Sequence, residues 1–204
     1  VPPMYFDAEF KNLKPGVIVS WEPNKDYTQW TFKVNPKAKF SDNSPLTAAD
    51  VKGTWEIITD PDTQAGRAKS YLGNIKGWQD LRDKKTTEMA GLKVLDDRTL
   101  QVTLDKPDPV FHYRIATCHL APIKASLAKG KVLTWWLPQN KPVGTGPFVL
   151  SAFDPDKKEA TAVKNPNWWM DEGPYLDKIE FRFVADAETV ATMFQNNQLD
   201  ASPK

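Results

Sequence analysis

The side chains that could perform covalent chemistry are few in this chain. It contains two histidines, His112 and His119, and a single cysteine, Cys118. Because neighbouring side chains in regular structure point apart, we expect a small buried thiol beside a surface imidazole rather than a Cys–His pair. No serine lies in a Gly-x-Ser-x-Gly motif, and one cysteine supplies neither a disulfide nor a metal cluster. The sequence predicts a protein that is not an enzyme and holds no cofactor and no metal.

The glycine-rich segment Gly144-Thr145-Gly146-Pro147 resembles a phosphate-binding loop only superficially. It lacks the Lys-Ser/Thr pair or third glycine that would grip a phosphate, and Pro147 removes a backbone donor. Two glycines flanking Thr145 instead predict unusual backbone dihedrals or close packing where the chain crosses between layers. We expect no nucleotide site here.

Tryptophan occurs at several times its usual share, with 8 residues in a chain of 204. The adjacent pairs Trp135-Trp136 and Trp168-Trp169 must place their rings in different environments, so one ring of each pair is expected to be exposed or in a groove. Aromatic walls suit the recognition of peptides, sugars or other partly apolar ligands, although core and hinge packing would also use single tryptophans. Trp135 and Trp136 are therefore candidate ligand-binding residues.

Composition and charge exclude several classes of partner. Lys and Arg number 27 against 26 Asp and Glu, and the two signs are interspersed, which argues against nucleic acid. The hydrophobic share of 40% and charged share of 26% are those of an ordinary globular domain. No apolar run is long enough to span a membrane, and the first residues, Val1-Pro2-Pro3-Met4, do not form a secretory signal.

Two β-hairpins are predicted in the first half of the chain. The β-branched run 17–21 is followed by a segment dense in turn-forming residues and then by 27–34, where apolar residues recur at every second position. Runs 91–95 and 99–104 flank the turn Asp96-Asp97-Arg98 and predict the second hairpin.

Helices are predicted between and after these hairpins. Thr47 stands three residues before Asp50, a variant of the capping box, so a helix should begin near Thr47 and end at 60–62, where a proline follows an aspartate. Segments 110–116 and 122–128 are expected to form two short helices.

The last third is predicted to return to β-sheet. Runs 147–153, 159–163 and 179–184 are alternating or β-branched, and 187–196 follows the helical pattern. Strands therefore bracket a central helical stretch without regular βαβ alternation. The predicted fold class is α/β, of the mixed α+β kind.

Three stretches of the chain carry a family pattern. The most specific is 39–51, which is similar to the signature Phe-x-Asp-Gly-x-Pro-Leu-Thr-Ala-x-Asp-Val. Asn43 replaces its glycine, a mild departure because asparagine tolerates the left-handed conformation that a turn needs there. The others are 13–34, containing Ser20-Trp21-Glu22, and 142–201. Together they resemble the family 5 extracellular solute-binding proteins, the peptide, dipeptide and nickel receptors of ATP-driven importers.

This resemblance implies a periplasmic-binding-protein-like class II lobe, with a mixed sheet and flanking helices. Family members are much longer and close two lobes on a ligand, so this chain should represent most of the first lobe, with the second lobe absent. Residues 1–34 and 142–204 would form the sheet-rich part of that lobe, and 35–141 an inserted subdomain of helices and a hairpin. Tyr71, in Ser70-Tyr71-Leu72, resembles a ligand-facing tyrosine of the family.

The function implied by the resemblance is that of the substrate-binding component of an ATP-driven importer. It would bind peptides or a similar small solute by lobe closure and dock on an ABC permease in the membrane. The location would be periplasmic or at the cell surface, with the full-length protein exported or lipid-anchored as a lipoprotein. Alternatives are a carbohydrate-binding module or carbohydrate-active enzyme domain, motivated by the tryptophans, and a sensor domain that has lost transport.

Overall fold

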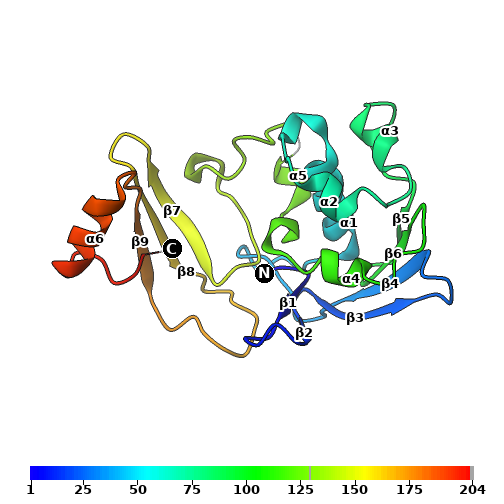
Figure 1. Cartoon of the computed structure of the whole chain (residues 1–204), viewed down its shortest axis with the longest axis horizontal. Coiled ribbons are helices and arrows are strands. Elements are labelled where there is room, and N and C mark those ends of the chain that lie inside the picture. Colours follow the sequence, from blue (N-terminus) through cyan, green and yellow to red (C-terminus); the bar gives the residue numbers. More distant parts are fainter. Residues whose placement is uncertain (129, 203–204) are drawn as a thin grey trace.

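The structure, a computed structural model, describes residues 1–128 and 130–202. Figure 1 shows two parts: helices packed over one face of a four-stranded sheet, and a separate three-stranded sheet followed by a helix. A small hairpin of β1 (Met4–Phe6) and β2 (Leu13–Pro15), which the sequence patterns did not predict, lies between the two parts. This mixture of sheets and helices confirms the predicted fold class.

The four-stranded sheet contains both predicted hairpins. They are β3 (Ile18–Pro23) with β4 (Gln29–Val34), and β5 (Leu92–Asp96) with β6 (Thr99–Thr103), all antiparallel in the order β3-β4-β6-β5. Where β4 pairs with β6, Trp30 lies opposite Val102 and Phe32 opposite Leu100. All four side chains are buried, so this face of the sheet forms the centre of the core.

Helix α1 (Ala48–Thr59) covers this sheet and begins where the capping pattern predicts. One carboxylate oxygen of Asp50 accepts hydrogen bonds from the backbone N–H and the hydroxyl of Thr47, each 2.8 Å long. Trp55, in the middle of the helix, is fully buried and meets the ring of Phe32 edge-on at 6.5 Å. The last helical residue is Thr59, and Asp60 caps the helix directly before Pro61, close to the predicted end.

Short helical segments complete this part of the molecule. They are α2 (Ala68–Leu72), α3 (Trp78–Arg82), α4 (Phe111–Arg114) and α5 (Ala125–Ala128), with the 3-10 turns η1 (Pro61–Thr63), η2 (Cys118–Leu120) and η3 (Pro138–Asn140). Helices α4 and α5 confirm the two predicted short helices. No pattern predicted α2 and α3, because helices this short depend on tertiary packing and carry little periodicity of their own.

The second sheet confirms the prediction for the last third of the chain. Strands β7 (Phe148–Asp154), β8 (Glu159–Lys164) and β9 (Lys178–Arg182) form an antiparallel meander, and α6 (Ala187–Gln195) follows. Strands β3 and β4 share one sheet with β5 and β6, and strands β7, β8 and β9 form the other. The division of the chain into 1–34 with 142–204, and 35–141, stays a prediction.

Two turn predictions have opposite outcomes. Asn43 has a φ of 68°, as predicted for the position where the family signature has glycine. Gly144 and Gly146, in contrast, do not have positive φ, and a Cβ at Gly144 would meet nothing within 4 Å. The expectation of unusual dihedrals or close packing at these glycines is wrong. It is Thr145 between them that is buried.

Candidate ligand-binding face

Tyr71 lies at the surface above the core of the first part of the molecule. Helix α2 buries Ala68 and Leu72, which are four residues apart and share one face. Tyr71 is only half-buried, and its ring stacks on the ring of His119 with 5.7 Å between centroids and 26° between planes. The predicted binding residue is thus one half of an aromatic pair, which we call the Tyr71–His119 shelf.

The His119 ring is oriented by Thr117, the residue that caps η2. Its hydroxyl oxygen lies 2.9 Å from Nδ1 of His119 and 3.4 Å from the backbone nitrogen of His119. The hydroxyl can accept from the backbone N–H and donate its own hydrogen to Nδ1. In that arrangement the neutral imidazole carries its proton on Nε2, which becomes a donor.

Cys118 differs from its prediction. It is exposed, not buried, and its Sγ lies 4.0 Å from Nδ1 of His119. Sequence neighbours approach each other here because 118–120 form a tight 3-10 turn instead of a strand or an α-helix. Since the Thr117 hydroxyl already lies 2.9 Å from the same nitrogen, it is the closer partner of His119.

Helix α1 positions both halves of the shelf, because α2 and η2 both pack against it. The segment after η2 is also tied to α1: the backbone N–H of Ile123 donates to the buried hydroxyl of Thr54 over 3.0 Å. Thr54 in turn donates to the carbonyl of Asp50, one turn earlier in the helix, over 2.7 Å. The shelf therefore rests on a rigid element whose start is fixed by the capping box.

The shelf combines apolar surface with two polar tips. Within the described residues, no hydrogen bond involves the Tyr71 hydroxyl or Nε2 of His119. Two stacked rings supply flat apolar area, while the hydroxyl and the ring N–H can pair with a carbonyl or carboxylate of a ligand. This arrangement suits recognition of a partly apolar, hydrogen-bonding solute such as a peptide.

Trp135 and Trp136 lie elsewhere. The ring of Trp136 meets Phe153 of β7 edge-on at 5.3 Å, and its Nε1 donates to the carbonyl of Leu133 over 3.0 Å. Trp136 is 39% exposed, and Trp135 is half-buried. The structure thus places Trp136 on the second sheet, whereas Tyr71 packs beside α1. The role of these tryptophans in binding stays a prediction.

The two rings of the second tryptophan pair lie in different environments, as predicted, but neither ring is exposed. Trp169 is buried and donates from Nε1 to the carbonyl of Thr145 over 3.2 Å. Trp168 is half-buried and donates to the carbonyl of Glu172 over 2.7 Å. Both indole N–H groups therefore have partners within the protein, which indicates a structural role for this pair.

Sequence reasoning missed His119 and Thr117 as members of the shelf. One local signal was present, because a threonine two residues before a histidine can cap the turn and fix the ring.

In residues 1–128 and 130–202, no three His, Cys, Asp or Glu side chains gather in a way that could hold a metal ion. No helix in those residues is long and apolar enough to cross a bilayer.

Comparison with known proteins places this chain in a family. Residues 12–204 match the model for bacterial extracellular solute-binding proteins, family 5 Middle. The periplasmic oligopeptide-binding protein OppA of Salmonella typhimurium is 30% identical over 189 residues, covering 91% of this chain and 34% of OppA. The periplasmic murein peptide-binding protein MppA of Escherichia coli is 34% identical over 183 residues, covering 88% of this chain and 33% of MppA.

Solved structures agree with these sequence matches. Haemophilus influenzae OppA in complex with the peptide RPPGFSPFR superposes with a TM-score of 0.84 at 27% identity, over 98% of this chain and 39% of that one. The Escherichia coli murein tripeptide-binding protein MppA gives a TM-score of 0.85 at 26% identity, over 98% and 38%. This chain therefore spans about a third of the length of the curated relatives that it matches.

Proposed function

We propose that this chain, which belongs to the bacterial extracellular solute-binding proteins of family 5, is part of the substrate-binding component of an ATP-driven importer. The protein would act outside the cytoplasm, in the periplasm or at the cell surface, and deliver its ligand to an ABC permease in the membrane. Binding would stabilise a closed arrangement of two lobes, of which this chain supplies part of one.

The family match along residues 12–204 is the observation that carries this proposal. The Tyr71–His119 shelf supports it from the structure, since it offers apolar surface with two polar tips that make no hydrogen bond within the described residues. We propose Tyr71 and His119 as ligand-contacting residues, with Thr117 as the residue that orients His119. Trp135 and Trp136 are proposed as a secondary contact surface.

A peptide is the ligand class that we propose. The relatives OppA and MppA are named for oligopeptides and murein peptides. Another relative, the probable deoxycholate-binding periplasmic protein YgiS of Escherichia coli, is 28% identical over 201 residues. A shelf without a formal charge of its own would bind the peptide backbone and apolar side chains, and not one particular charged group.

The proposed role involves binding and no bond cleavage. The Cys118 thiol lies 4.0 Å from Nδ1 of His119, and the Thr117 hydroxyl lies closer to the same nitrogen. A base held in this way is poorly placed to activate the thiol.

Native mass spectrometry of the full-length protein, purified without refolding, tests the proposal. We expect co-purified short peptides that are released on denaturation. A bound sugar or bile acid would retain the fold and contradict the peptide assignment. The full-length protein should also bind peptides from a random library after its native ligand is removed. If it binds none of them, the receptor function itself is contradicted.

A further inference from the structure

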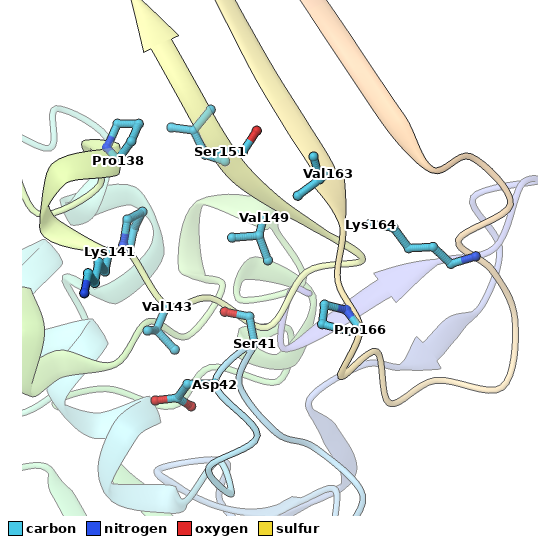
Figure 2. Close-up of a pocket in the computed structure, with 12 residues that line it drawn as sticks. Ser41, Asp42, Pro138, Lys141, Val143, Val149, Ser151, Val163, Lys164 and Pro166 are labelled. Carbon is cyan, nitrogen blue, oxygen red and sulfur yellow. The ribbon is translucent and has the colours of Figure 1, made fainter.

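A cavity of about 420 Å³ lies between the two parts of the molecule, away from the residues of the Tyr71–His119 shelf. Two stretches distant in sequence form its walls, as Figure 2 shows. One is the turn at Ser41 and Asp42, and the other is 138–166, which supplies the segment 138–143, strands β7 and β8, and Pro166. This volume falls within the range of about 300–1,000 Å³ that is typical of small-molecule sites.

Hydrogen bonds between the walls hold the cavity open. The backbone N–H of Ser41 donates to the carbonyl of Gly144 over 2.9 Å, and the side-chain amide of Asn167 donates to the carbonyl of Ser41 over 2.8 Å. The turn, the segment that leads into β7 and the loop after β8 are therefore fixed to one another. A site that is already formed loses less entropy when a ligand binds.

The interior of the cavity is apolar. Its floor and sides carry branched aliphatic side chains and proline rings, all of them at least partly exposed: Pro138, Pro142, Val143, Val149, Leu150, Val163 and Pro166. A bulge in β7, between Leu150 and Ala152, turns Ser151 out of the regular ladder beside this floor. Apolar surface of this kind favours a ligand with a hydrocarbon body.

The charged residues at the cavity rim differ in whether they already have a partner of opposite charge. The Asp42 carboxylate is already paired with Lys124 at 2.6 Å. Lys164 turns its ammonium group away from the cavity, as Figure 2 shows, with Asp177 3.9 Å away. Lys141 forms no ion pair or hydrogen bond through its side chain within the described residues. Among the lining residues it is thus the cation left to meet an anionic ligand.

The backbone of Lys141 fixes the point on the rim from which its side chain starts. The residue ends η3 in the left-handed conformation, with φ 50° and ψ 62°, and its N–H donates to the carbonyl of Pro138 over 2.9 Å. Figure 2 shows Lys141 across the cavity from Val163 and Pro166, with its ammonium group turned outward, so this exposed side chain must rotate about its own bonds to reach a ligand between the walls.

We propose that this cavity is a second binding site, for a small organic acid with an apolar body and a single carboxylate. The hydrocarbon would lie against Val149 and Val163, and the carboxylate would pair with Lys141. An amine of the same size would find the rim acid already neutralised by Lys124, so the site discriminates by charge at one end of the ligand.

Ligand-observed NMR on the full-length protein tests this proposal, with sodium hexanoate, hexan-1-ol and hexylamine as probes of equal chain length. We expect hexanoate to bind more tightly than hexanol, and hexylamine to bind least. Lys141→Met should weaken hexanoate binding about tenfold and leave hexanol unchanged. Lys25→Met, which removes an exposed lysine outside the cavity, is the matched control and should change neither.

Two further variants locate the site. Val163→Trp fills the cavity at a position that is already 38% exposed, so it should fold and abolish binding of both hexanoate and hexanol. Tyr71→Ala should leave hexanoate binding intact, which separates this site from the proposed peptide site. The proposal is overturned if hexanoate does not bind at about 10 mM, if the two lysine variants behave alike, or if Val163→Trp still binds hexanoate.

Discussion

The two sheets of this molecule differ in how far their apolar residues are covered. In the four-stranded sheet, Trp30, Phe32, Leu100 and Val102 are at most 2% exposed. In the three-stranded sheet, Phe181 is 45% exposed, and α6 has no buried residue at all. The same chain thus contains one part with a closed core and one part whose apolar side chains remain open to solvent.

This contrast indicates where the stability of the chain resides and where further contacts would form. Burial of apolar area is the main favourable term in folding, so the first part should dominate the free energy of unfolding. The second part contributes hydrogen bonds within β7–β9 and the walls of the cavity, but little buried apolar volume. An open apolar face also gives the second part the capacity to associate.

The largest expected effect compares one aromatic residue from each part. Trp55→Ala removes a fully buried ring that packs edge-on against Phe32, so it should lower the free energy of unfolding by about 3–5 kcal/mol. Phe181→Ala, its counterpart in β9, should cost well under about 1 kcal/mol because much of that ring is already exposed. Urea denaturation measures both. Equal losses of unfolding free energy in the two variants would contradict the contrast between the two parts of the molecule.

A smaller effect compares the helix caps of the two parts. Asp50→Ala removes the acceptor of two hydrogen bonds at the start of α1 and should cost about 1 kcal/mol of global stability. Asp186→Ala removes the acceptor for the Thr189 N–H at the start of α6. Because α6 buries nothing, this change should fray the helix locally without moving the urea midpoint. Amide hydrogen exchange distinguishes local from global opening.

The smallest effect concerns the turn that borders the cavity. Partial burial of Asp42 acts to raise its pKa, but hydrogen bonds from Lys124 and Ser44 outweigh it and lower the pKa to about 2. Since the folded pKa lies below the unfolded value of about 3.9, the stabilisation is present above that pH and is lost as pH falls toward 2. The contribution is small because the carboxylate is 37% exposed.

Lys124→Met tests this pairing. This variant should return the pKa of Asp42 toward its ordinary value, which NMR titration of the side-chain carboxyl measures. It should also remove the stabilisation that the lowered pKa gives as the pH falls. Lys37→Met is the control, because Lys37 pairs with a different carboxylate, Asp171. A pKa of Asp42 that stays the same in Lys124→Met would contradict the pairing.

Local patterns predicted the fold well where the signal is contained within a few residues. Alternation of apolar residues between 27 and 34 is enough to define β4, and Thr47 with Asp50 defines the start of α1. The one-turn helix α2 could not be predicted, because burial of Ala68 and Leu72 against the rest of the core is what forms it.

The site was predicted less completely, because its parts come together only in three dimensions. Tyr71 was a candidate from the family resemblance, but nothing local pairs it with His119, which is far away in sequence. Cys118 was expected to be buried, because neighbouring side chains point apart in regular structure, and it lies exposed in a 3-10 turn. Trp136 packs on Phe153 of β7, a contact that depends on how the segment before β7 folds back.

Binding of a peptide to the full-length protein and to its Tyr71→Ala variant is the measurement that tests the ligand-binding role of the shelf most directly. Isothermal titration calorimetry should show a loss of affinity of about tenfold or more on removal of the ring. Tyr113→Ala, which removes an exposed tyrosine stacked on Phe6, should bind like the unmodified protein. Equal affinity for Tyr71→Ala and the unmodified protein, with both folded, would contradict the account.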